Sequence, residues 1–230
     1  MSPERLFGYR DYTLDEWQEH FDRIYGAKNR SMTSPEIWYR MLEEIGELAQ
    51  AARPPSLEGI EVALPDIFAW LAALANRKGT SLTDAVGDRF AYGCPWCGAR
   101  ENCGCIYYPD RSVVRASAPE TTMPLFEGVK GKSLDAWVDG FEKLYGTSNR
   151  DRSLMDIITR LVANAGEVAK AMRERVPRDR LDNRLANVFA WIIAVYIKYS
   201  SIRGASAKPF SKLVIDKYAH CAKCFRIPCE

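Results

Sequence analysis

Residues 41–52, which read MLEEIGELAQAA, place acidic side chains inside an otherwise apolar run: Glu43, Glu44 and Glu47. Residues three or four positions apart are neighbours on a helix, so the last of these glutamates shares a face with each of the other two. A later apolar segment, PDIFAWLAAL at 65–74, contains Asp66. If the two segments form antiparallel neighbouring helices, Asp66 meets Glu44 and Glu47.

Carboxylates that gather away from bulk water repel one another, and a divalent cation removes that cost. Hard oxygen ligands on rigid helices suit Mg²⁺ or Mn²⁺, and Mg²⁺ usually also holds a substrate phosphate. The alternative is a solvated helix surface, where glutamate pairs are common. The spacing therefore makes these acids candidate ligands of Mg²⁺ or Mn²⁺ and leaves the surface interpretation open.

Seven cysteines form a second group of candidate ligands, in two short clusters: Cys94, Cys97, Cys103 and Cys105, then Cys221, Cys224 and Cys229. Four thiolates close together suit a tetrahedral, structural Zn²⁺ site, with reduced thiols in a flexible segment as the alternative. In the second cluster His220, or a group from elsewhere in the chain, is the candidate fourth ligand. A nucleic-acid-binding zinc knuckle is the less favoured interpretation of the two clusters.

The chain also repeats itself. Residues 14–53 align without gaps on 134–173, and a shift of one more residue aligns 65–74 with 186–195. Tryptophan, glycine and asparagine identities recur in register, which indicates a tandem duplication. We expect a first copy at 1–110, a connector rich in proline, serine and threonine at 111–130, and a second copy at 131–230.

Local signals favour helices throughout. Thr13 and Glu16 form a capping box, Gly26 is a plausible helix end, and Pro65 predicts a kink or a late helix start. No segment alternates with period two for long enough to indicate a sheet. The expected fold is all-α, with two related four-helix units, each followed by its cysteine-rich segment. The helices are expected near 14–25, 34–52, 58–77, 81–90, 134–145, 152–175, 180–202 and 208–219.

The order E-E-x-x-E, then LPDIFAWLAALAN, then Cys-x-x-Cys resembles the MazG-like nucleotide pyrophosphohydrolases of the all-α NTP pyrophosphatase superfamily. The match covers about residues 34–105, with a weaker copy at 154–229. The resemblance implies a helical bundle that cleaves a nucleoside triphosphate between the α and β phosphates, giving a monophosphate and pyrophosphate. It makes Glu44, Glu47 and Asp66 ligands of Mg²⁺, and Glu43 a ligand or the group that orients water.

One position departs from that family pattern. The second motif expects a glutamate three residues before the aspartate, where this chain has Ala63; Glu61 is out of register with it. The second copy has lost more acids, because the positions of Glu43, Glu44 and Asp66 carry Ala163, Asn164 and Asn187. We expect weak or absent turnover, with natural degeneration and an engineered inactivation as the two alternatives for Ala63. The second copy is expected to act as a built-in pseudo-subunit. A catalytically inactive nucleotide sensor or scaffold is the alternative.

Composition bounds the remaining expectations. The formal net charge is +2, from 32 basic and 30 acidic side chains, so electrostatics give no reason to expect nucleic acid or an anionic membrane as a partner. No apolar run approaches the roughly 20 residues of a membrane span, and we expect a cytoplasmic protein, as a homodimer or an intrachain pseudo-dimer. Its expected partner is a nucleoside triphosphate or a related nucleotide. Candidate nucleotide-binding residues, with surface or core packing as their alternative, are Arg30, Trp38, Arg53 and Lys78.

Overall fold

The computed structural model describes residues 9–53, 56–104, 126, 128, 130–221 and 223–229, and within them the regular structure is helical, without strands. The expected all-α class is confirmed. Two short 3₁₀ turns, η2 (Tyr9–Asp11) and η4 (Gly204–Ser206), accompany the α-helices. The α-helices are α1 (Leu14–Ser31), α2 (Ser34–Ala51), α3 (Leu57–Lys78), α4 (Leu82–Arg89), α5 (Leu134–Asp151), α6 (Leu154–Glu174), α7 (Arg178–Arg203) and α8 (Phe210–Tyr218).

Side-chain caps explain where many of these helices begin. Thr13 and Thr33 each form a complete capping box with the glutamate three residues later. Serines cap four further helices by accepting a hydrogen bond from a backbone N–H: Ser56, Ser81, Ser133 and Ser153. Helices α7 and α8 instead begin directly after a proline.

The expected end of the first helix at Gly26 is wrong, because α1 continues to Ser31. Asp22 and Arg30, on either side of the glycine, form an ion pair at 3.3 Å. A Cβ atom at Gly26 would lie 2.4 Å from the Asp22 carboxylate, so the glycine makes room for this pair. A late start at Pro65 is also not found, since α3 begins at Leu57 and contains the proline.

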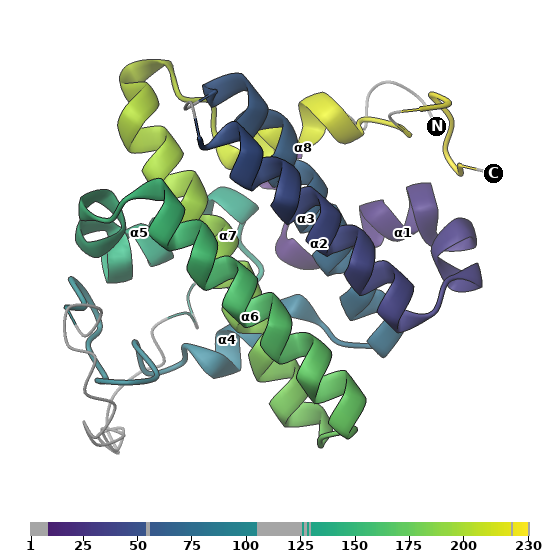
Figure 1. Ribbon diagram of the computed structural model, residues 1–230, viewed down its shortest axis with the longest axis horizontal. Helices are drawn as coiled ribbons and strands as arrows, with labels where there is room; N and C mark the ends of the chain where they lie inside the picture. The colour runs from purple at the N-terminus through teal and green to yellow at the C-terminus, as the bar shows by residue number, and fades with distance from the viewer. Residues whose placement is uncertain are drawn as a thin grey trace.

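Matching helix pairs pack in the two halves of the chain. Helix α3 contacts α1 and α2, as α7 contacts α5 and α6, and the halves meet where α3 packs on α7 and α2 on α6 (Figure 1). Thr13 and Ser133, the caps of α1 and α5, form an isolated antiparallel bridge. One hydrophobic core contains residues of both halves, including Phe68 and Phe189.

The short fourth helices lie against the opposite half. Helix α4 packs against α7, and α8 packs against α3. The predicted connector at 111–130 falls mostly outside the described residues. The two cysteine segments follow α4 and α8, and in Figure 1 the teal one lies on the side of α5 and the yellow one on the side of α1. The short fourth helix of each half therefore covers the third helix of the other half.

One helix of the described part is long and apolar enough to cross a membrane by length and composition, Arg178–Ser206, which includes α7. Of its most apolar window, 61% is buried inside the fold. A core helix passes the same test, and α7 lies between α4, α5, α6 and α3.

Candidate acidic site and cysteine centres

Helices α2 and α3 bring part of the predicted acidic group together. Asp66 is buried with 8% of its surface exposed, Glu44 is half-buried, and Glu43 and Glu47 are exposed. Glu43 forms an ion pair with Arg40 at 2.8 Å on the surface of α2. The centre of the group is therefore Glu44 and Asp66, with Glu47 at its edge.

The acids of this group influence one another electrostatically. Burial, followed by the charges of Asp66 and Glu47, raises the pKa of Glu44 to about 7. The ammonium of Lys217 and a hydrogen bond from Trp70 act in the opposite direction. Burial and the neighbouring acids thus both disfavour the ionised form of Glu44.

Two side chains of α8 hold Asp66. The Tyr218 hydroxyl donates to its Oδ1 atom, and the Lys217 ammonium donates to its Oδ2 atom and to the Val62 carbonyl. The sequence interpretation missed both residues, because they come from the second half of the chain. A signal does exist: DKYAHC at 216–221 resembles DRFAYGC at 88–94, just before each cysteine cluster.

The corresponding place in the second half contains few acids. Asn187, at the position of Asp66, accepts a hydrogen bond from the Arg89 side chain of α4 at 3.1 Å. Glu167, which matches Glu47, pairs with Arg184 at 3.3 Å. Arg184 stands where the first half has Ala63, so arginine supplies the positive charge at this place.

The position expected to hold a further carboxylate does not supply one. Ala63 is buried with 3% of its surface exposed. Glu61 turns toward the second half, where it accepts a hydrogen bond from the Tyr199 hydroxyl at 2.6 Å and lies 3.6 Å from Arg203 and from Lys208. Glu61 therefore does not replace the missing glutamate beside Asp66.

The donor types of the acidic group fit Mg²⁺ or Mn²⁺, since all are carboxylate oxygens. Among the described residues, however, the sets of three ligand atoms within 4.8 Å of one another are cysteine sets, and Glu44, Glu47 and Asp66 do not form one. Both oxygens of Asp66 also have protein partners. A metal ion at this place competes with the Lys217 ammonium for Asp66.

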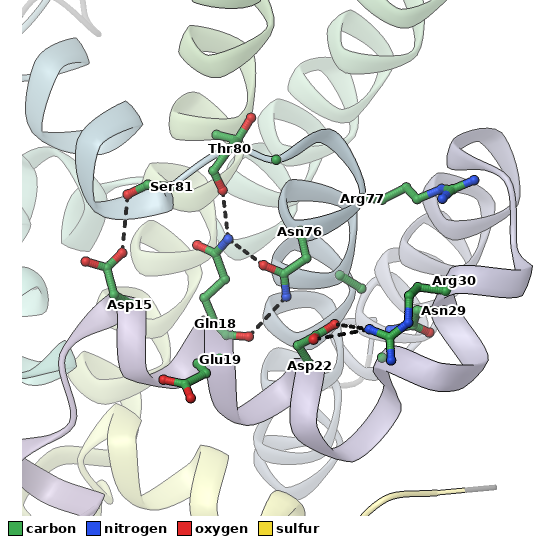
Figure 2. A pocket seen from close by; sticks show the side chains of 13 residues that line it. Asp15, Gln18, Glu19, Asp22, Asn29, Arg30, Asn76, Arg77, Thr80 and Ser81 are labelled. Carbon is green, nitrogen blue, oxygen red and sulfur yellow. Dashed lines mark hydrogen bonds and ion pairs between the residues drawn. The ribbon is translucent and has the colours of Figure 1, made fainter.

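Arg30, one of the predicted nucleotide-binding residues, lines a groove of about 670 Å³ between α1, α3 and the start of α4. Figure 2 shows Arg30 facing Asp22, while Gln18 bridges to Asn76 and to the Thr80 carbonyl. The backbone carbonyl of Gln18 also accepts a hydrogen bond from the side-chain amide of Asn76. The polar groups of the groove thus tie α1 to α3 and to the segment before α4.

The other predicted nucleotide contacts are not among the residues that line this groove. The Trp38 ring N–H donates to the Ala165 carbonyl of α6 at 2.9 Å, so this side chain packs between the halves. Arg53 follows the far end of α2, a helix of 18 residues and about 27 Å. Lys78 ends α3, between the groove-lining residues Arg77 and Gly79, and does not line the groove itself. A shared nucleotide-binding surface of these four residues stays a prediction.

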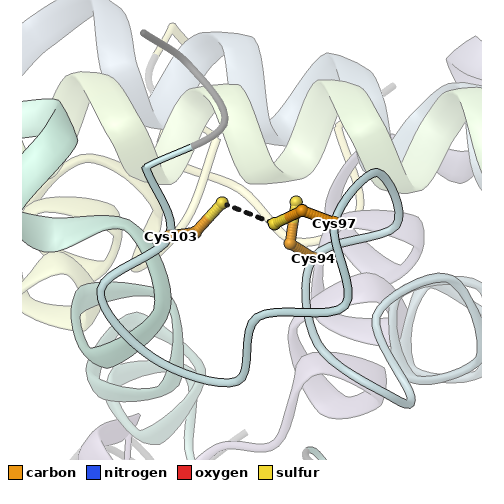
Figure 3. A group of neighbouring side chains, drawn as sticks. All are labelled: Cys94, Cys97 and Cys103. Atoms are coloured by element: carbon orange, nitrogen blue, oxygen red, sulfur yellow. Dashed lines mark hydrogen bonds between the residues drawn. The ribbon is translucent and has the colours of Figure 1, made fainter. Parts of the chain in front are cut away.

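Three cysteines of the first cluster converge. The Sγ atoms of Cys94, Cys97 and Cys103 lie within 4.8 Å of one another, and those of Cys97 and Cys103 are 3.4 Å apart. Figure 3 shows Cys97 facing Cys103. Hydrogen bonding from Cys103, together with Tyr145 and nearby backbone N–H groups, outweighs burial and lowers the pKa of Cys94 to about 4. Cys105 lies outside the described residues. These three thiols could hold a metal ion such as zinc, as predicted.

The second cluster forms a similar set. The Sγ atoms of Cys221, Cys224 and Cys229 lie within 4.8 Å of one another. His220 does not join them; its Nδ1 atom lies 3.2 Å from the Cys221 carbonyl and its ring packs on Phe225. The six described cysteines are all reduced. This set could also hold a metal ion such as zinc.

Comparisons of the chain with protein-family models, with curated proteins and with solved structures gave no match.

His20 on α1 gives the fold a predicted pH dependence. The ring is buried, its Nε2 atom lies 2.6 Å from the Tyr218 carbonyl, and its charged neighbour is Arg23. Burial lowers the pKa of His20 below 6.5, against the effect of the hydrogen bond, and Arg23 lowers it further. The unfolded chain therefore takes up a proton first as the pH falls below about 6.5, so this contribution to stability is complete above that pH and declines below it.

We expect the unfolding free energy to fall between pH 7 and pH 5, with at most about 1.4 kcal/mol per pH unit coming from His20. His20→Gln, whose amide N–H can still donate to the Tyr218 carbonyl, should remove this part of the slope. Chemical denaturation of both proteins across this pH range measures it, and equal slopes would contradict the assignment.

Proposed function

We propose that the first half of the chain is a Mg²⁺-dependent nucleotide pyrophosphohydrolase site, which converts a nucleoside triphosphate to a monophosphate and pyrophosphate with low turnover. In this proposal the halves are tandem MazG-like repeats, of which the second is degenerate. The observation that carries the proposal is the pairing of Glu44 with buried Asp66 under α8. The corresponding place in the second half has Asn187 and an Arg184–Glu167 pair instead.

Each residue of the site has a role in this proposal. Asp66, Glu44 and Glu47 would hold the ion, which when bound neutralises phosphate charge and activates water. Asp66 is well positioned because its helix is buried between α1, α2 and α7. Lys217, once released from Asp66, is near enough to pair with a phosphate oxygen and is itself part of the site. Tyr218 keeps its hydroxyl at Asp66 and excludes water from that side.

The low turnover follows from Ala63. Its methyl group cannot orient an attacking water, and Glu61 is held by Tyr199, Arg203 and Lys208. A positioned general base typically contributes a factor of about 10² or more to the rate. Loss of that group leaves the neighbouring acids to position the substrate with little acceleration of the chemical step.

Pyrophosphate release from a panel of nucleoside triphosphates in Mg²⁺ tests the proposal. We expect slow release by the natural chain, none by Glu44→Gln, and at least a tenfold increase in Ala63→Glu. Glu58→Gln, on the exposed first turn of α3, is the matched control and should behave as the natural chain. No release by either the natural chain or Ala63→Glu, or release that survives Glu44→Gln, would overturn the proposal.

A second candidate function is a catalytically inactive nucleotide sensor or scaffold. The contact of Lys217 with Asp66 favours it, because an ammonium already supplies the positive charge that a metal ion would bring. Calorimetry with the same nucleotides, run beside the release assay, separates the two functions. Binding without release supports the sensor, and neither binding nor release supports the scaffold.

A further inference from the structure

Each cysteine cluster is docked on the first helix of the opposite half. The backbone N–H of Cys103 donates to the Leu144 carbonyl of α5 at 2.8 Å, and the Ser148 hydroxyl donates to the Cys103 carbonyl at 2.6 Å. In the second cluster the N–H of Cys229 donates to the Ile24 carbonyl of α1 at 2.7 Å. Leu144 and Ile24 occupy equivalent positions of the internal repeat, so the two dockings correspond.

The clusters also share their internal backbone bonds. In the first, Cys94 donates to the Ala99 carbonyl at 2.8 Å and Gly98 donates to the Cys94 carbonyl at 2.8 Å. In the second cluster, the backbone N–H of Cys221 donates to the Arg226 carbonyl at 3.1 Å, and the N–H of Phe225 donates to the Cys221 carbonyl at 2.9 Å. Gly98 and Phe225, at matching positions, both have a positive φ, of 72° and 57°. The two segments therefore follow one turn that gathers three sulfur atoms.

We propose that the two cysteine sets are reciprocal metal clasps that bind Zn²⁺ or a similar thiophilic divalent ion and lock the halves together. An ion at Cys94, Cys97 and Cys103 fixes the tail of the first half on α5. An ion at Cys221, Cys224 and Cys229 fixes the tail of the second half on α1. The thiols that bind release their protons to solvent.

Burial and chain geometry support this role. Cys103, which carries the docking bond of the first set, is fully buried, and Cys221 and Cys229 are buried in the second. Three sulfur atoms that converge on one point suit a metal ion better than they suit a disulfide, which would join only two. Within 94–104 and within the described residues of 221–229 neither segment has a regular helix to hold it in place, so loss of the ion releases the tail from the opposite half.

Metal analysis and hydrogen exchange test the clasps on the whole chain. We expect two zinc ions per chain, and a sulfur-to-metal charge-transfer band after substitution with Co²⁺. Cys94→Ser/Cys97→Ser and Cys221→Ser/Cys224→Ser should each lose one ion. The first variant should speed amide exchange in α5 while α1 is unchanged, and the second should do the reverse.

A reciprocal clasp differs from a local fold of each tail because substitutions in one half speed amide exchange in the first helix of the other half. Unchanged metal content, or faster exchange confined to the half that carries the substitutions, would overturn the proposal. Neither readout depends on nucleotide hydrolysis, so the clasps and the proposed pyrophosphohydrolase activity stand or fail separately.

A milder variant decides the matter if the cysteine variants do not fold. Ser148→Ala keeps every thiol and removes the side-chain bond to Cys103. It should retain two ions and release the first up to about tenfold faster to a chelator, the factor expected for one neutral hydrogen bond. Ser206→Ala, whose hydroxyl contacts only a local carbonyl among the described bonds, is the matched control. Equal release rates in the two variants would contradict the docking.

Discussion

Replacing Phe68 by alanine is expected to lower the free energy of unfolding by about 4 kcal/mol, the cost of removing a fully buried aromatic ring. Phe68 has no exposed surface and lies at the meeting point of the two halves. Its ring centroid is 5.4 Å from that of Phe21 on α1, 5.9 Å from Phe189 on α7 and 5.8 Å from Phe210 on α8. The cavity therefore weakens contacts within the first half and between the halves at once.

We also expect both halves to unfold in a single transition, before and after the substitution. Guanidinium titrations followed by circular dichroism and by tryptophan fluorescence measure this, since the six tryptophans are distributed over both halves of the chain. Tyr39→Ala is the control, because that side chain is 61% exposed and should change stability by less than about 0.5 kcal/mol. Separate transitions for the two probes, or a loss below about 1 kcal/mol in the Phe68 variant, would contradict the shared core.

Replacing Asp66 by alanine is expected to cost about 3 kcal/mol, because it leaves the Lys217 ammonium and the Tyr218 hydroxyl without their acceptor. The side chains of Asp66 and Lys217 are 12% and 24% exposed, so solvent compensates only part of the loss. Because of this partial exposure, we place the cost at the lower end of the range of about 3–5 kcal/mol that is typical for breaking a buried ion pair.

Asp66→Asn is the informative comparison. An amide oxygen can still accept from Tyr218 or Lys217, and the second half already carries Asn187 at this position beside Arg89. We expect this variant to lose less than half as much stability as the alanine variant while losing pyrophosphate release. Thermal and chemical denaturation of the two variants measure the difference. Equal losses would contradict the expectation, because they would show that an amide oxygen of the same shape cannot replace the carboxylate charge at Asp66.

Features encoded by nearby residues were predicted well from the sequence. Thr13 and Thr33 cap their helices as their spacing to glutamate requires, and three cysteines of each cluster converge because short turns join them. Gly26 misled the prediction because a glycine signals a helix end only when nothing else needs the space. Here the Asp22–Arg30 pair uses it.

Features that depend on distant parts of the chain could not be predicted in the same way. No local pattern states that α8 packs against α3, so Lys217 and Tyr218 were not recognised as partners of Asp66. Trp38 was a candidate nucleotide-binding residue, and its hydrogen bond to α6 has no local sequence signal. In both cases the deciding contact lies more than 120 residues away in the sequence, at the interface between the halves.

The central claim is that the acids of α2 and α3 form a divalent-cation site for a nucleotide. The most direct test is a crystal grown with Mn²⁺ and an α,β-methylene triphosphate analogue, examined by anomalous scattering. The account predicts a manganese peak between Glu44 and Asp66, in contact with the analogue, and a Lys217 ammonium that has left Asp66. A map without that peak, in which Lys217 still holds Asp66, would contradict it.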